Sequence, residues 1–361
     1  MDIRESLKYG WKKLAETWWW ITLASFYMPI GGALYLLAGF TASRWANNPD
    51  ILGALNYRTF SSFLKSPVNL KSYIGYTITA LVMFLIIYFF AGYIPSKWAA
   101  NKQHNRVMFQ TALIFFILNV TFALLSYLAI ATASKQPPLF SFNMLVSQYF
   151  LQIANGVFGV TIFILIAVIS YIYEKFTVKS ALHLVVIYFI TITLEFLLLQ
   201  PFTFKMVANG RVVTPLIGII MALIYFVFTT IALFISAETV IQDDLGKGTK
   251  KGLHLLWARS SILWTYLLVW IITFAISYIV EYFVMLSFRL THTAPSSSFL
   301  TVPAILLTIT MLGEAYLAFV TFKLALIFEN KESENEDQED SGEPADELNV
   351  EGKTSEGEAQ A

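Results

Sequence analysis

Residues 262–286 read ILWTYLLVWIITFAISYIVEYFVML, and Glu281 is the only charged residue in this stretch. A helix rises about 1.5 Å per residue, so the stretch can cross the roughly 30 Å hydrocarbon core of a bilayer. Lipid offers no hydrogen-bond partner to an open backbone, and an isolated run of this kind therefore adopts an α-helix. The stretch predicts a transmembrane helix and excludes a core strand of a soluble domain.

Apolar runs of similar length recur along the chain as far as residue 328. They lie near residues 18–40, 73–94, 109–131, 155–173, 181–200, 214–237, 262–286 and 299–328. In the first run, Pro29 is followed by Gly31 and Gly32, which can interrupt a helix. We expect an all-α fold, a polytopic transmembrane bundle of about eight spans that occupies residues 18–328.

The overall composition agrees with a membrane protein. Hydrophobic residues make up 57% of the chain and charged residues 13%, whereas soluble domains contain about a quarter charged residues. The chain has no cysteine, which excludes disulfides, thiolate metal sites and cysteine nucleophiles.

The formal net charge of zero hides two oppositely charged parts. Residues 1–328 contain 22 Lys and Arg against 11 Asp and Glu, and residues 329–361 contain 2 against 13. The second part has almost no apolar residue to bury, so we expect 329–361 to be a disordered acidic tail. A solvated tail is one interpretation of its charge, and docking on basic loops or on a partner is the other.

Lysines and arginines also predict the orientation, because they concentrate on the cytoplasmic side of membrane proteins. With the N-terminus inside, the inner segments carry 15 of them and the outer loops 8, and Lys323 falls within the last run. If the first run did not span, the division would be 12 to 11. We therefore expect a multi-pass protein of the cell membrane with both termini in the cytoplasm.

Residues 1–17 predict an amphipathic helix before the first run. Apolar side chains recur at spacings of three and four, at Ile3, Leu7, Trp11, Leu14 and Trp18. Lys8, Lys12 and Lys13 occupy the other side. We expect this helix to lie on the inner leaflet, where its lysines meet anionic headgroups.

A second basic amphipathic segment precedes the run at 262–286. Its apolar side is formed by Leu253, Leu256 and Trp257, and its polar side carries Lys250, Lys251 and Arg259. Aligned without gaps, Gly10 falls on Gly252, and a membrane run follows at the same distance in both places. This indicates an internal repeat, although so short a match also arises by chance in a biased composition.

A family resemblance rests on residues 237–261 and on the opening of the chain. A span that ends in AETVI at 237–241, a glycine-containing turn and a basic helix that closes on ARSS at 258–261 are similar to bacterial membrane proteins related to the membrane domain of glycerophosphoryl diester phosphodiesterases. The LKYGW sequence at 7–11 resembles the opening of the same group, and the whole match covers about a fifth of the chain. The acidic tail and Asp243-Asp244 depart from the pattern. The resemblance implies a membrane scaffold without the catalytic domain of the phosphodiesterase.

No motif of an enzyme or a metal site occurs in the sequence. The four histidines, His104, His183, His254 and His292, are scattered and form no H-E-x-x-H pattern. No G-x-S-x-G is present, and the glycine-rich stretch 246–249 lacks the first glycine of a P-loop. We expect no catalytic residue, no metal and no cofactor.

Three carboxylates lie within apolar runs: Glu195, Glu281 and Glu314. An ionisable group at depth is costly unless it is paired, hydrated or neutralised, so each is a candidate intramembrane polar site. They could line a cation or proton path, or bind the amine of a lipid headgroup. The alternative is that Glu195 and Glu281 reach the interface and that Glu314 is protonated or bonded to a neighbouring helix.

These patterns favour a non-enzymatic membrane protein. The leading interpretation is a scaffold or accessory protein of the bacterial cell envelope that engages lipid or a partner protein. The alternative is a transporter, or the permease subunit of an ATP-driven exporter, because the amphipathic helix before the first span resembles the elbow helix of such exporters. The expected partners are the bilayer, its anionic lipids, and a partner protein or a second copy of the chain; no nucleic acid is expected.

Overall fold

The described part of the chain is built from helices. The computed structural model describes residues 2–45, most of 74–132, and then 157–208, 215–291 and 298–340, and these ranges contain no strand. The long helices are α1 (Asp2–Trp45), α5 (His104–Thr132), α7 (Val157–Ile172), α8 (Val178–Ala208), α9 (Pro215–Gln242), α10 (Leu245–Ala258), α11 (Leu263–Thr291) and α12 (Ser298–Asp340). Shorter helices are η1 (Phe89–Tyr93), η2 (Pro95–Lys97) and η3 (Ser260–Ile262). The predicted all-α fold is confirmed.

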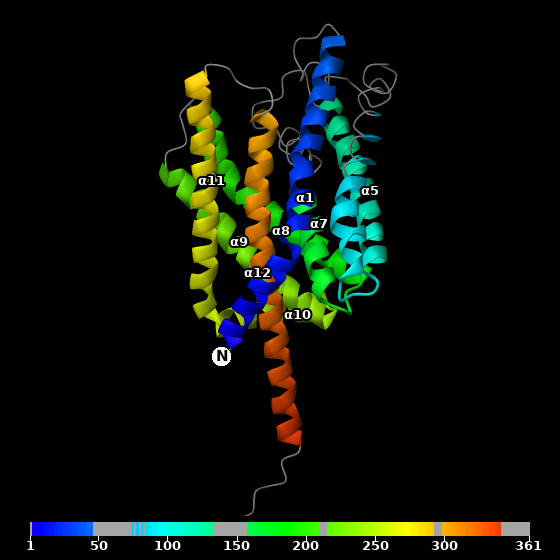
Figure 1. Ribbon diagram of the computed structural model, residues 1–361, viewed down its shortest axis with the longest axis vertical. Helices are drawn as coiled ribbons and strands as arrows, with labels where there is room; N and C mark the ends of the chain where they lie inside the picture. The colour runs from blue at the N-terminus through cyan, green and yellow to red at the C-terminus, as the bar shows by residue number, and fades with distance from the viewer. Residues whose placement is uncertain are drawn as a thin grey trace, which may run out of the picture.

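The long helices stand side by side along the long axis of the molecule (Figure 1). The helix α10 lies across the lower end of this bundle, and α12 extends beyond the same end. The N-terminal turns of α1 lie at this end as well, where they cross α12. One end of the bundle therefore gathers the two amphipathic segments and the acidic part of α12.

Three stretches in the described residues are long and apolar enough to cross a membrane. They are Leu223–Gln242 in α9, Ser260–Ser277 in η3 and α11, and Thr308–Lys331 in α12. Shorter apolar helices lie at Phe84–Lys97, Thr161–Ile172 and Val178–Thr191. The chain is thus a helical membrane protein. Many side chains of the predicted runs near 18–40 and 109–131 lie outside the described residues.

The helix α1 joins two segments that the sequence analysis separated. It is continuous from Asp2 to Trp45, through both the predicted interfacial helix and the first apolar run. Its most extensive packing is on α12. Gly10 makes this contact close, because a Cβ on Gly10 would lie 2.5 Å from Val320 Cγ2. The packed face is therefore the one with small residues, which allow close approach of helices, whereas Trp11 and Trp18 are exposed.

The helices α9 and α10 form a tight hairpin. The Asp244 side chain caps α10 by accepting a hydrogen bond of 2.7 Å from the backbone N–H of Lys247. This N–H group holds the pKa of the Asp244 carboxyl below its ordinary value. Further along α10, a Cβ on Gly248 would lie 2.3 Å from Thr239 Cα in α9. The glycines of α10 thus fix this helix along the end of α9.

The two glycines that the sequence alignment paired have the same structural use. A Cβ on Gly252 would lie 2.7 Å from Ile235 Cα in α9, much as one on Gly10 would press on α12. Both amphipathic helices turn a glycine toward the bundle. The exposed tryptophans do not correspond, because the same alignment places Trp11 on Leu253 and Ala15 on Trp257. The shared glycine position agrees with an internal repeat, which stays a prediction.

The expected start of the acidic tail falls inside a helix. Beyond Phe328, α12 continues through the acidic residues to Asp340. A helix that is already anchored by a span can extend cheaply, because each added residue brings a hydrogen bond without a new nucleation step. Residues 341–361 lie outside the described residues.

Candidate functional site

Glu314 lies in α12 and is the one predicted carboxylate whose side chain is described. It is 1% exposed. Glu195 and Glu281 belong to α8 and α11, but their side chains lie outside the described residues. The structure therefore places one of the three candidate intramembrane carboxylates in the interior of the bundle.

Two aromatic residues from neighbouring helices accompany Glu314. The hydroxyl of Tyr225, in α9, donates a hydrogen bond of 2.6 Å to Glu314 Oε1. The ring of Trp270, in α11, packs edge-on against the Tyr225 ring, with 5.2 Å between the ring centroids. The helices α11 and α12 approach closely here, because a Cβ on Gly313 would lie 2.8 Å from Thr273 Oγ1. We call Glu314, Tyr225 and Trp270 the Glu314 site.

Two polar atoms of the Glu314 site have no hydrogen-bond partner among the described residues. They are Glu314 Oε2 and Trp270 Nε1, and both are buried. Most buried polar atoms in proteins are paired, because an unpaired one loses its bonds to water without replacement. A proton or a small cation at Oε2 would offset this loss. The arrangement therefore has the chemistry to bind one of them.

Tyr225 and Trp270 were not among the residues predicted from the sequence. The chain contains 18 Tyr and 9 Trp, many of them in apolar runs. Aromatic residues at this density fill cores and membrane interfaces in general. Only the packing of α9 and α11 against α12 distinguishes these two from the rest.

Exposed lysines and tryptophans gather on α1 and α10 at the lower end of the bundle. Lys8, Lys12 and Lys250 are exposed and form no ion pair with a described residue. Trp11 is 69% exposed and Trp257 is 85% exposed. We call these five side chains the basic end. Lysine beside exposed tryptophan is typical of helices at the headgroup level of a membrane.

The other predicted basic residues are engaged within the protein. Lys13 forms an ion pair of 2.7 Å with Glu16, and Lys251 forms one of 2.9 Å with Glu329. Arg259 is the C-cap residue of α10. The six predicted basic residues thus divide into three exposed lysines and three half-buried residues.

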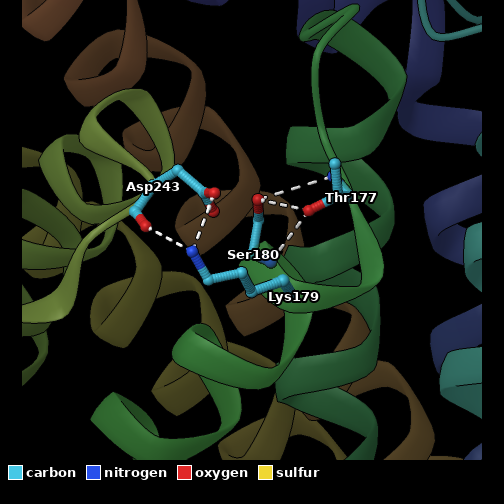
Figure 2. Close-up of polar contacts among 4 residues, drawn as sticks. All are labelled: Thr177, Lys179, Ser180 and Asp243. Carbon is cyan, nitrogen blue, oxygen red and sulfur yellow. Dashed lines mark hydrogen bonds and ion pairs between the residues drawn. The ribbon is translucent and has the colours of Figure 1, made fainter.

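Figure 2 shows a further ion pair, which sequence reasoning missed. Lys179 Nζ lies 2.9 Å from Asp243 Oδ2 and 2.9 Å from the Asp243 carbonyl oxygen. Asp243 has φ 49°, a left-handed conformation that Asp tolerates better than most residues. Thr177 and Ser180 hold the start of α8 in position, because the Ser180 N–H donates to Thr177 Oγ1 at 3.2 Å. The pair joins the start of α8 to the turn between α9 and α10, so its role is structural.

His104, Asn101 and Ser170 form a buried polar cluster where α5 meets α7. His104 Nε2 lies 3.1 Å from the Ala91 carbonyl oxygen and must carry the proton, since a carbonyl only accepts. His104 Nδ1, 3.0 Å from Ser170 Oγ, then accepts from the serine. Asn101 donates to the Phe176 carbonyl oxygen at 2.8 Å. Burial lowers the pKa of His104 to about 4. Because its groups are paired, the cluster is structural.

No family model, no curated protein and no solved structure matches the chain. Within the described ranges, no group of three or more His, Asp or Glu side chains could hold a metal ion. The two features of the described chain that bear on function are therefore the Glu314 site and the basic end.

Proposed function

We propose that the protein is a non-enzymatic scaffold or accessory protein of the bacterial cell envelope whose basic end binds anionic lipid. The observation that carries this proposal is the exposure of Lys8, Lys12 and Lys250 beside Trp11 and Trp257, on helices that glycines fix to the bundle. Each lysine near an anionic membrane surface contributes about 1 kcal/mol. The tryptophans would set the depth of the basic end in the headgroup layer.

The proposal includes a multi-pass topology of about eight spans in the cell membrane, with both termini in the cytoplasm. It is supported by three helices long enough to cross and by the division of Lys and Arg, 15 to 8. A chain with no native cysteine suits a labelling map with single introduced cysteines. Cysteines at Lys8 and Lys250 should resist an impermeant thiol reagent added outside intact cells. Labelling of either from outside would overturn the orientation.

Retention of anionic lipid tests the binding proposal directly. The protein and a triple variant, Lys8→Gln, Lys12→Gln and Lys250→Gln, would be purified in neutral detergent with added phosphatidylglycerol. Native mass spectrometry would then count the bound lipid. We expect the triple variant to bind phosphatidylglycerol on the order of a hundredfold more weakly, because three contributions of about 1 kcal/mol each are lost and about 1.4 kcal/mol corresponds to a factor of ten.

A matched control removes the same charge from elsewhere in the chain. Lys97, Lys102 and Lys175 are exposed and lie outside α1 and α10. Their replacement by Gln should leave most of the lipid binding in place. Equal loss in the two triple variants, or no loss in either, would contradict a lipid site at the basic end.

The Glu314 site favours a second candidate function, transport of protons or small cations by a transporter or permease subunit. The supporting observation is that Glu314 Oε2 is buried without a partner among the described residues. Proteoliposomes with an internal pH dye report the movement of protons, either alone or in exchange for a small cation. Glu314→Gln should abolish this movement. Tyr316→Phe, on the same helix, is the control. Identical fluxes in the wild type and Glu314→Gln would exclude the assignment.

The resemblance to proteins related to the phosphodiesterase membrane domain agrees with the scaffold proposal and stays a prediction. Binding of a partner protein or of a second copy also stays a prediction. Both are compatible with lipid at the basic end, because lipid would occupy only the lysine and tryptophan side chains of α1 and α10.

A further inference from the structure

The acidic part of the chain already touches one of the amphipathic helices. Lys251 Nζ in α10 lies 2.9 Å from Glu329 Oε2, and Glu329 is the first residue of the acidic stretch 329–361. Each of the two side chains is about one-third exposed, at 34% and 33%. The His254 ring lies 5.7 Å from the Phe328 ring, centroid to centroid, beside this pair. The acidic stretch therefore begins in contact with α10.

The charges of the two regions are complementary. The stretch 329–361 has 13 acidic residues against 2 basic ones. The N-terminal turns of α1 and the helix α10 lie at the same end of the bundle as the acidic part of α12 (Figure 1). Lys8 and Lys12 in α1 and Lys250 in α10 are exposed and form no ion pair with a described residue. Opposite charges on one chain attract at a high effective concentration, because the linker prevents them from separating.

The chain is long enough for the acidic residues to return to these lysines. From Glu329 to Asp340, α12 carries the chain about 16 Å along its axis. Residues 341–361, which include six Asp and Glu, reach at most roughly 70 Å when extended. That reach exceeds the distance back along α12 several times over. Residues 341–361 can therefore contact the basic end without any change in the helices.

We propose that residues 341–361 bind the basic end and compete there with anionic lipid. This inference rests on the proposed function, because it names what occupies the lysines when anionic lipid is scarce. In a neutral bilayer the acidic segment covers Lys8, Lys12 and Lys250. Anionic headgroups displace the segment and release it into the aqueous phase, where a partner can reach it. The segment thus reports the charge of the surrounding lipid.

Cysteine crosslinking tests the contact itself. His254 in α10 is exposed and is not one of the lysines, so the pair His254→Cys and Glu347→Cys leaves the basic end intact. Ala100, an exposed residue before α5, gives the control pair Ala100→Cys and Glu347→Cys. In phosphatidylcholine nanodiscs the His254 pair should form a disulfide faster than the control pair. Its yield should fall about threefold between ~0.05 M and ~0.5 M salt, because the Debye length shortens from about 14 Å to about 4 Å.

Lipid competition gives the second measurement. Adding phosphatidylglycerol to the nanodiscs should lower the crosslinking yield of the His254 pair and leave that of the control pair unchanged. A variant with Gln or Asn in place of the six acidic residues of 341–361 should bind phosphatidylglycerol several-fold more tightly than the wild type. Lys353→Gln makes the net charge of the segment more negative and should therefore weaken the binding of phosphatidylglycerol.

The outcomes separate this inference from the proposed function. Equal crosslinking yields for the His254 and Ala100 pairs, with unchanged lipid binding after neutralisation of the segment, would overturn the competition. The lipid proposal would still stand if Lys8→Gln, Lys12→Gln and Lys250→Gln together weakened binding. If that triple variant bound lipid normally while the His254 pair crosslinked, the segment would occupy the basic end, and the lipid proposal would fail.

Discussion

Gly248 of α10 lies so close to Thr239 of α9 that a Cβ on the glycine would stand 2.3 Å from the Thr239 Cα and 2.6 Å from its backbone nitrogen. Backbone atoms cannot rotate away as the end of a side chain can. The contact therefore admits only glycine at position 248 unless α10 moves away from α9.

Gly248→Ala should lower the stability of the protein in detergent by about 2 kcal/mol or more, because the two helices must separate to admit the methyl group. Gly246→Ala is the matched control. A Cβ on Gly246 would meet only Asp244 Oδ1, at 3.4 Å, and alanine favours the helix. Thermal melting followed by circular dichroism checks both variants. Similar melting temperatures for the two would refute the close contact.

The hydrogen bond between Tyr225 and Glu314 predicts energetic coupling between these residues. Tyr225→Phe removes the donor to Glu314 Oε1 and should destabilise the protein by about 1–3 kcal/mol. In a Glu314→Leu background, the same tyrosine change should cost less, because no carboxyl oxygen is left unpaired. The measurement is a double-mutant cycle from melting in detergent. Tyr316→Phe in place of Tyr225→Phe should give additive effects, and additive effects for the Tyr225 pair would refute the coupling.

The buried imidazole of His104 predicts a loss of stability in acid. Its pKa is lowered to about 4 by burial, whereas an unfolded chain has a histidine pKa of about 6.5. Between these values the unfolded state binds the proton and the folded state does not, so stability falls as the pH decreases from about 6.5 to about 4. The expected total is on the order of 3 kcal/mol.

Melting temperatures measured at pH 7 and at lower pH check this dependence. His104→Gln should be less stable than the wild type near neutrality, but it should lose less stability in acid. His254→Gln replaces an exposed histidine and should keep the acid dependence of the wild type. An unchanged pH dependence in His104→Gln would show that other groups cause the loss.

Exposed and buried tryptophans should differ in their contact with lipid. Trp257 and Trp264 are 85% and 76% exposed, whereas Trp20 and Trp270 are 1% and 3% exposed. Lipid brominated near the headgroup quenches the fluorescence of tryptophans that touch it. The quenched fraction of the total fluorescence should therefore be smaller in a variant with Trp257→Phe and Trp264→Phe than in the wild type. A variant with Trp20→Phe and Trp270→Phe should lose only fluorescence that the brominated lipid does not quench. Quenching that is unaffected by the first pair would place α10 away from the headgroups.

The helices could be predicted from the sequence because their signal is local. The run 262–286 is apolar along its whole length, and the structure has the helix α11 there. Helix ends were harder to predict, because they depend on neighbours. The continuation of α12 through residues 329–340 follows from an anchored span, which no composition rule for acidic stretches takes into account.

The candidate sites could be predicted only in part, for a related reason. Glu314 was identifiable because a carboxylate in an apolar run is rare. Its contact with Tyr225 joins residues far apart in the chain, and many tyrosines were equally plausible partners. The basic residues were predicted as one group, yet Lys251 is paired with Glu329. Pairing between residues of different helices depends on tertiary packing, which cannot be predicted from a single sequence.

The packing of α1 on α12 constrains how the protein is made. These are the first and the last helices of the described chain, and they share its most extensive helix contact. While a ribosome is still delivering the middle of the chain, the face of α1 around Gly10 lacks the α12 surface on which it packs in the finished protein. All the intervening helices must insert without covering that face. Because α12 also packs against α7, α9 and α11, the packing of the bundle is completed only after α12 has left the translocon. A protein stalled before α12 would expose these unpacked helix faces to chaperones and membrane proteases.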